Sequence, residues 1–144
     1  MKKRQVKAPK IYFRDTGLLH YLLGIRSEKD LLGHPKSGSS WEGYVIEEAI
    51  KTVEPDEVYY WATHGGAEID LILLKRGRML GVECKRTDAP RITPSMRTAL
   101  AELKLEQIAV VYPGTKRYPV AERVAAVPLE AVADGMKGLF PKRA

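Results

Sequence analysis

The sequence has almost no cysteine and no long apolar run. Its 144 residues include one cysteine, so it cannot form an internal disulfide. No stretch approaches the roughly 20 apolar residues that a membrane-spanning helix needs, and the N-terminal residues lack the pattern of a secretory signal peptide. Internal repeats and low-complexity segments are also missing. These absences favour one cytoplasmic domain with one core, for which the length is sufficient.

Two kinds of chemical signature are absent as well. The chain contains no G-x-x-x-x-G-K-[ST] motif, which excludes an ATP site of the P-loop type. It contains no evident nucleophile–base pair and no glycine-rich phosphate loop, so an enzyme acting on a small molecule has little support. The composition is that of a folded protein, with 44% hydrophobic and 29% charged residues.

Positive charge exceeds negative charge by six, but the excess is confined to one end. Residues 1–14 contain six of the 24 basic residues and no acid, and the other 18 basic residues balance all 18 acids. We therefore expect residues 1–10 to be a basic arm or linker remnant, and the body of the domain to meet nucleic acid only through local clusters. Four clustered arginines are candidate nucleic-acid contacts, although ordinary solubilising charge explains them equally well: Arg76, Arg78, Arg86 and Arg91.

The most informative stretch is residues 68–85, EIDLILLKRGRMLGVECK. It predicts two apolar strands joined by a tight turn centred on Arg76 and Gly77. In that register Asp70 lies opposite Glu83, and two carboxylates that face each other across a ladder repel. A divalent cation between them would relieve the repulsion. The repulsion would also be weak if both carboxylates faced water. A longer turn would shift the register, so that the two acids would no longer lie opposite each other.

The same hairpin places the neighbouring charges. The register sets Glu68 opposite Lys85. Lys85 also shares a face with Glu83, where it could neutralise that carboxylate. The alternation of strand side chains predicts that four residues of the first strand lie on one face: Glu68, Asp70, Ile72 and Leu74.

A helix is predicted from Ser40 to about Val53. Its apolar residues spread over about half of the helix surface at roughly 100° per residue, and Glu42 lies near the middle of that apolar arc. A carboxylate on a buried face is costly unless it is paired or bound to a metal. The alternative is a capping box, because Ser39-x-x-Glu42 fits the S-x-x-E pattern that turns the glutamate back to the backbone.

The order of the elements predicts an α/β fold, with a mixed central sheet flanked by helices and a parallel crossover from Gly81 to Tyr112. We expect residues 11–38 to form short helices and a loop, and residues 39–144 to form the α/β core. The remaining predicted elements are short helices over 16–23 and 28–32, a loop over 33–39, a strand over 57–62, a helix over 94–105, strands over 107–112 and 124–127, and a closing helix from residue 128.

Four blocks of sequence together resemble a known family. They are IYFRDTGLLHYLLGI, WEGYVIEEAI, YYWATHGGAEIDLILL and GVECK. In this order and spacing they resemble the C-terminal domain of unknown function that is attached to predicted bacterial and archaeal AAA-type ATPases, over about residues 9–136. A second resemblance is carried by Glu42 of the predicted helix, Asp70 of the first strand and the E-x-K set Glu83-Cys84-Lys85. This combination resembles the PD-(D/E)xK nuclease superfamily, which implies a restriction-endonuclease-like core. Ile69 replaces the proline of that motif.

The resemblance implies a role for each acid. Asp70 and Glu83 would hold Mg²⁺ or Mn²⁺ together with the backbone carbonyl of Cys84, and Glu42 would join them directly or through water. Lys85 would orient the attacking water and stabilise the charge that develops on the phosphorane.

Glu68 is placed less firmly by the resemblance. It would pair with Lys85 or tune the metal from outside the ligand set.

Two functions of different class follow from this comparison. The first is a metal-dependent nuclease domain that cuts phosphodiesters, with DNA as the expected substrate. The second is a nuclease fold that has lost turnover and serves an ATPase as a nucleic-acid-binding or protein-interaction module. The intact Asp70, Glu83 and Lys85 favour the first.

The resemblance also implies an ATPase domain as partner, so we expect the chain to be a fragment of a longer protein or a free-standing relative. The apolar residues 18–23 and the aromatic residues 59–61 leave a homo-oligomer open.

Overall fold

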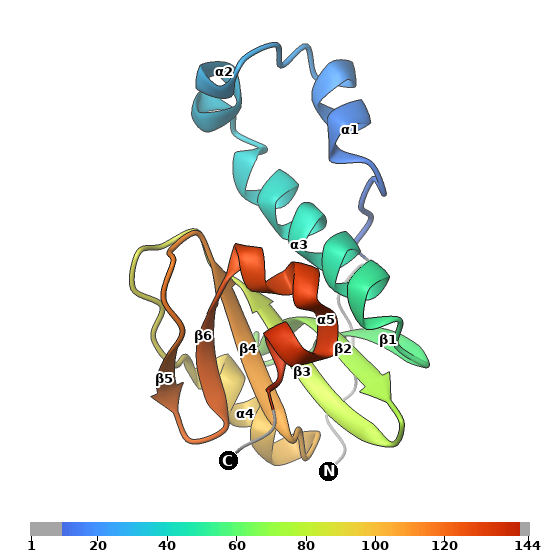
Figure 1. Ribbon diagram of the computed structural model, residues 1–144, viewed down its shortest axis with the longest axis vertical. Helices are drawn as coiled ribbons and strands as arrows, with labels where there is room; N and C mark the ends of the chain where they lie inside the picture. The colour runs from blue at the N-terminus through green and yellow to red at the C-terminus, as the bar shows by residue number, and fades with distance from the viewer. Residues whose placement is uncertain (1–9, 142–144) are drawn as a thin grey trace.

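A computed structural model describes residues 10–141 (Figure 1). The predicted basic arm therefore lies outside the described residues, except for Lys10. The helices are α1 (Thr16–Leu22), α2 (Glu28–Gly33), α3 (Ser37–Val53), α4 (Pro94–Glu102), the 3-10 helix η1 (Leu129–Asp134) and α5 (Gly135–Leu139). The strands are β1 (Glu57–Ala62), β2 (Glu68–Lys75), β3 (Arg78–Cys84), β4 (Gln107–Tyr112), β5 (Tyr118–Ala121) and β6 (Val124–Pro128).

The strands form one mixed sheet in the order β1-β2-β3-β4-β6-β5. β2 pairs antiparallel with both β1 and β3, and β5 pairs antiparallel with β6. β4 lies parallel to both β3 and β6. A parallel pair needs a crossover connection, and α4 supplies it between β3 and β4. The predicted mixed sheet and its parallel step are confirmed.

Helices cover both faces of the sheet, as the element order predicted. Val45 and Ala49 of α3 pack with η1 and α5 against Leu71 and Leu73, which forms one apolar cluster (Figure 1). On the other face, α4 packs against a second cluster that contains Ile72. Burying apolar residues on both sides explains why β2 and β3 read as near-continuous hydrophobic runs.

The hairpin between β2 and β3 has the predicted register. Lys75 pairs with Arg78 and Leu71 pairs with Val82, so the loop contains only two residues. These are Arg76 with φ 51° and Gly77 with φ 75°. Two consecutive positive φ values define a type I′ turn, whose twist matches that of the flanking strands.

A β-bulge interrupts the pairing of β2 with β1. The register shifts between Tyr59 and Trp61, and across that shift β2 has two residues, Asp70 and Leu71, where β1 has one. Ile72 packs beneath α4, whereas Asp70 interacts with groups on the α3 side. The prediction that Asp70 and Ile72 share a face is therefore wrong, because a bulge breaks strict alternation.

Some element boundaries also differ from prediction. α3 begins at Ser37, so the helix takes up part of the expected 33–39 loop and the boundary drawn between residues 38 and 39 falls inside it. The short edge strand β5 was not predicted, because Pro119 interrupts its pattern. The closing helix is divided into η1 and α5 at Gly135, whose φ is 56°.

α1 and α2 project beyond the sheet (Figure 1). Each has a side-chain N-cap: Asp15 accepts from the Leu18 N–H at 2.9 Å, and Ser27 accepts from the Asp30 N–H at 3.1 Å. Within the described part of the chain, neither helix has a buried residue. Over residues 10–141, no helix combines the length and apolarity that crossing a membrane requires.

Candidate active site

The candidate site lies at the end of the β2–β3 hairpin opposite its turn. The regular ladder ends at the pair Leu71–Val82, and beyond it side chains bridge the two strands. The Cys84 N–H donates to Asp70 Oδ2 at 2.9 Å. The Asp70 N–H is 3.4 Å from Glu83 Oε2. The structure therefore brings Asp70 and Glu83 together, as the sequence predicted.

Both carboxyl groups are buried, with exposed fractions of 8% for Asp70 and 4% for Glu83. Burial and the charge of Glu42 raise the pKa of Asp70. Burial and the charge of Asp70 raise the pKa of Glu83 to about 7. Desolvation and a like charge both oppose ionisation, so at neutral pH this pair favours a proton or a cation.

Lys85 partly supplies that positive charge. Its Nζ is 2.6 Å from Glu83 Oε1, which confirms local neutralisation of this carboxylate. Its backbone N–H donates to the Val111 carbonyl of β4 at 2.9 Å, so the residue is anchored in the sheet. Partial burial lowers the pKa of Lys85, but the Glu83 hydrogen bond and charge outweigh it and the pKa is raised. The ammonium therefore stays charged at neutral pH, and 38% of the side chain is exposed.

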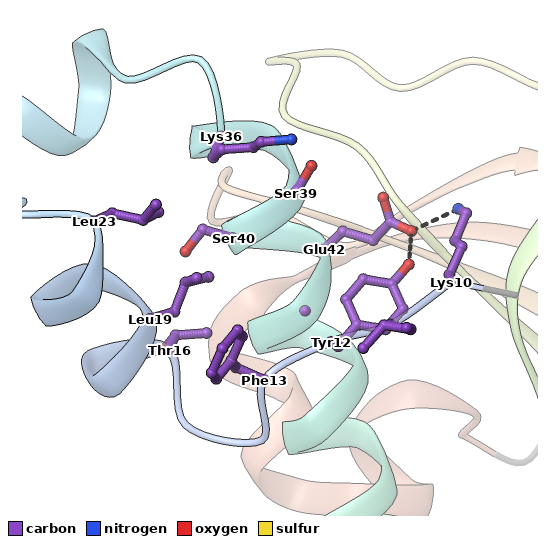
Figure 2. Close-up of a pocket in the computed structure, with 12 residues that line it drawn as sticks. Lys10, Tyr12, Phe13, Thr16, Leu19, Leu23, Lys36, Ser39, Ser40 and Glu42 are labelled. Carbon is purple, nitrogen blue, oxygen red and sulfur yellow. Dashed lines mark hydrogen bonds and ion pairs between the residues drawn. The ribbon is translucent and has the colours of Figure 1, made fainter.

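Glu42 approaches the site from α3 and is engaged by the N-terminal segment. Lys10 Nζ lies 2.7 Å from Glu42 Oε1, and the Tyr12 hydroxyl donates to the same oxygen. Figure 2 shows both side chains converging on this carboxylate. The capping box is wrong, because Ser39 lies inside α3. The other alternative, a paired carboxylate, is the one observed.

Lys10 links Glu42 to the hairpin acids. Its Nζ is 3.2 Å from Asp70 Oδ1 and 4.9 Å from the centre of the Tyr60 ring. Nothing in the sequence distinguishes Lys10 from the other basic residues of the predicted arm. The contact joins positions 60 apart in sequence, so no local pattern points to it.

The remaining predicted site residues, Glu68 and Cys84, have other surroundings. Glu68 accepts from the Tyr60 hydroxyl at 3.0 Å, next to the ring that Lys10 faces. Burial raises the pKa of the Cys84 thiol well above its ordinary value. A thiol that stays protonated is a poor metal ligand, so the backbone of Cys84 is the part of this residue suited to the site.

The four arginines separate into two groups. Arg76 and Arg78 lie at the hairpin turn, away from Asp70, and two guanidinium nitrogens of Arg78 donate to Glu106 at 2.9 and 2.7 Å. Arg86 and Arg91 follow Lys85 in the loop before α4. The Arg86 guanidinium donates to the Ser37 hydroxyl at the start of α3.

The donor set suits a hard divalent cation, although it is not assembled as a three-ligand cluster. Carboxylate and carbonyl oxygens are the ligands that Mg²⁺ and Mn²⁺ prefer. Over residues 10–141, no group of three His, Cys, Asp or Glu side chains is arranged to hold a metal. Asp70 and Glu83 are adjacent, whereas Lys10 is bonded to both Glu42 and Asp70. The types of donor thus suit a metal, whereas their arrangement places an ammonium in contact with two of the expected ligands.

Comparison with known proteins places the chain in a family. Residues 37–132 match a domain of unknown function, DUF4143. The chain belongs to the DUF4143 family. This match confirms the resemblance to a domain of unknown function, and it contains Glu42, Asp70, Glu83 and Lys85. Residues 1–29, which include Lys10, match a second domain of unknown function, DUF8612.

Two curated relatives of this DUF4143 protein are uncharacterized proteins of Mycobacterium tuberculosis (strain H37Rv) and Mycobacterium bovis. Each is 49% identical over 130 residues, which cover 90% of this chain. The chain spans about 30% of the length of these relatives. No solved structure matches.

Proposed function

We propose that this DUF4143 domain is a metal-dependent nuclease that cuts phosphodiester bonds in nucleic acid, with DNA as the substrate. The observation that carries the proposal is the buried pair of Asp70 and Glu83 with the Lys85 ammonium 2.6 Å from Glu83. Burying two adjacent carboxylates is costly unless a cation accompanies them. The mixed sheet flanked by helices is compatible with a restriction-endonuclease-like core, which is part of the same proposal.

Asp70, Glu83 and the Cys84 backbone carbonyl would hold Mg²⁺ or Mn²⁺, and Glu42 would join them. Such an ion lowers the pKa of bound water and neutralises phosphate charge. The Cys84 N–H donates to Asp70, and the Asp70 N–H in turn lies 3.4 Å from Glu83 Oε2. Glu68 would not bind the metal itself. It would influence the ligands through the hydrogen bond that it accepts from Tyr60.

Lys85 would act on the reacting phosphate. Its ammonium is fixed at Glu83, and its side chain is partly open to solvent. A cation that is already in place when negative charge develops lowers the barrier without reorganisation. Lys85 would also orient the attacking water through its N–H groups.

Nucleic acid would reach the site along Arg86 and Arg91, which follow Lys85 in the chain. Arg76 and Arg78 would contact only a substrate that extends along the hairpin to its turn. The body of the domain is formally neutral outside residues 1–14, so we propose that a partner strengthens binding. The ATPase domain implied by the sequence resemblance is the partner that we propose.

A second function, a catalytically silent module for nucleic-acid or protein binding, is favoured by one observation. Lys10 is ion-paired with both Glu42 and Asp70. A permanent ammonium there would satisfy the acids without any metal. The two functions differ in whether a divalent cation binds at Asp70 and Glu83.

The test is cleavage of linear duplex, single-stranded and branched DNA and of RNA, with Mg²⁺, Mn²⁺ or EDTA. We expect cutting that requires metal, is lost in Glu83→Ala and is retained in Glu57→Ala, which removes an exposed acid from β1. The same panel is run on the full-length Mycobacterium tuberculosis relative. If neither protein cuts, and calorimetry detects no Mn²⁺ binding, the silent module is the correct function.

A further inference from the structure

The segment that carries Lys10 and Tyr12 closes the candidate site from one side. Lys10 Nζ bridges carboxylates of two different elements, at 2.7 Å from Glu42 Oε1 of α3 and 3.2 Å from Asp70 Oδ1 of β2. Only 28% of the Lys10 side chain is exposed. A solvated surface lysine has no fixed position, whereas this ammonium is held by two acids that we assign to a metal.

Further contacts of the segment hold the ammonium in this position. The Tyr12 hydroxyl donates to the Glu42 oxygen that Lys10 also contacts. The Tyr12 ring packs against α3 so closely that a Cβ placed on Gly43 would lie 3.2 Å from it. The Tyr60 ring faces the ammonium at 4.9 Å, within the range of a cation–π interaction.

Each carboxylate at this position is paired with an ammonium group without a metal, although one negative charge remains in excess. Three carboxylates, Glu42, Asp70 and Glu83, are accompanied by the ammonium groups of Lys10 and Lys85. The Lys10 ammonium donates to Glu42 and lies 3.2 Å from Asp70, and two carboxylates at these distances stabilise its charged form. Lys10 is therefore charged at any physiological pH. A dication added beside it would be repelled at contact distance.

Lys10 can withdraw at little apolar cost while Tyr12 stays packed against the core cluster beside α3. Ile11, between the two anchoring residues, is 90% exposed. α1, which follows the segment, has no buried residue within the described part of the chain. Lys10, Tyr12 and Glu42 also line a cavity of about 460 Å³ that extends to Lys36 (Figure 2). This cavity gives the ammonium room to move away from Asp70 while the sheet stays intact.

We infer that the Lys10 ammonium is an internal competitor for the divalent cation at Glu42 and Asp70, and that metal binding displaces this ammonium from both acids. The inference rests on the proposed metal site and adds a regulatory contact to it. The ammonium acts as an autoinhibitory plug, and whatever draws the ammonium away raises the affinity for metal. The same contact means that Glu42 and Asp70 are already paired with a cation before the metal binds.

The first test compares Mn²⁺ affinity by calorimetry in the wild type and in Lys10→Met, which keeps the apolar stem and removes the charge. We expect Mn²⁺ to bind about tenfold more tightly to Lys10→Met, a size typical of coupling between two ligands. Lys10→Arg should keep the affinity of the wild type or weaken it. Lys36→Met is the matched control, because it removes one exposed positive charge from the same cavity; its effect should be much smaller.

The second test needs no variant. Lys10 in the wild-type protein is labelled with an amine-acylating reagent in EDTA and in saturating Mn²⁺, and its modification is quantified by mass spectrometry. Displacement predicts faster labelling of Lys10 in Mn²⁺ and unchanged labelling of Lys36. This readout remains valid if Lys10→Met fails to fold.

The outcomes separate this inference from the proposed function. Equal Mn²⁺ affinity in the wild type and Lys10→Met, or unchanged labelling of Lys10, overturns the inference and leaves the nuclease standing. Weaker Mn²⁺ binding in Lys10→Met also overturns it, and makes Lys10 part of the loaded site. If no Mn²⁺ binds to either protein, both the plug and the metal site are wrong.

Discussion

At the scale of single residues, the carboxylates of Asp70 and Glu83 can bind protons or pair with ammonium groups. In our proposal they also bind a metal. Asp70 and Glu83 are buried side by side, and the pKa of each is raised. Lys10 and Lys85 each bond to one of them. The site is thus a local excess of buried negative charge that is only partly neutralised, and its stability should respond to pH.

The first prediction concerns Glu83, whose pKa is about 7 in the folded protein and about 4.3 for an ordinary glutamate. Between these pH values the folded protein holds a proton that the unfolded chain has lost. Stability without metal should therefore fall as pH rises through this window. Glu83→Gln removes this titration, so the free energy of unfolding of the variant should not fall in this way. Between pH 5 and pH 8, its free energy of unfolding should therefore rise by on the order of 2 kcal/mol relative to that of the wild type.

The measurement is urea unfolding of both proteins in EDTA at the two pH values. A difference between Glu83→Gln and the wild type that is the same at pH 5 and pH 8 would show that Glu83 does not titrate in this range.

Part of the site could be predicted from single residues and their spacing. The proximity of Asp70 and Glu83 was predicted because a two-residue turn fixes which hairpin residues face each other, and that information is local. Lys85 was added to the site by the resemblance to the PD-(D/E)xK superfamily. The Lys10 contact could not be predicted, since it depends on how the N-terminal segment crosses α3. Glu42 was predicted as a ligand or a cap, and only the packing of α3 on the sheet shows that it is paired.

At the scale of elements, the β2–β3 hairpin and α3 together bring the acids into contact. β1 and the hairpin were predicted because their turn and apolar runs are strong local signals. The bulge at Asp70 and Leu71 was missed, because it depends on the partner strand β1. The start of α3 was missed for a related reason. Ser37 to Ser39 have low helix propensity, but Ser37 is buried and the helix extends through it.

The second prediction concerns the junction of η1 with α5. A Cβ on Gly138 would lie 1.7 Å from the Ala131 carbonyl oxygen, a contact that neither backbone can accommodate. Gly138→Ala should therefore lower the free energy of unfolding by about 2–4 kcal/mol. Gly38 in α3 is the control, because a Cβ there has no neighbour within 4 Å among the described residues. Gly38→Ala should change stability by less than about 1 kcal/mol.

Chemical denaturation of the two variants checks this prediction. Equal stability of Gly138→Ala and Gly38→Ala would mean that η1 and α5 do not approach each other as closely as the structure has them.

At the scale of the whole molecule, a well-packed sheet carries a poorly covered N-terminal extension. Val45, Ile69 and Leu73 are fully buried. In contrast, Tyr21 of α1 and Leu32 of α2 are 79% and 60% exposed. Apolar side chains exposed in one region are characteristic of interaction surfaces, which keeps the predicted homo-oligomer open.

The third prediction concerns local stability. In native-state hydrogen exchange of the dilute protein, amides of α1 and α2 should exchange by local opening at low free energy. Amides of β2, β3 and β4 should exchange only through global unfolding. Protection of α1 that rises with protein concentration would show that a second copy covers it. Protection of α1 equal to that of β3 at all concentrations would contradict the prediction.

The register of the hairpin also restricts how the chain can change length. Asp70 and Glu83 are separated by 13 positions. The two-residue turn between their strands cannot absorb an added or lost residue without a change of register. One inserted or deleted residue in either strand would rotate the rest of that strand to the other face and separate the acids. Length variation within the family should therefore be tolerated in the loop over residues 86–93 and rejected between Asp70 and Glu83. In a library of single-residue insertions, we expect insertions between Asp70 and Glu83 to disrupt the site and insertions over residues 86–93 to leave it intact.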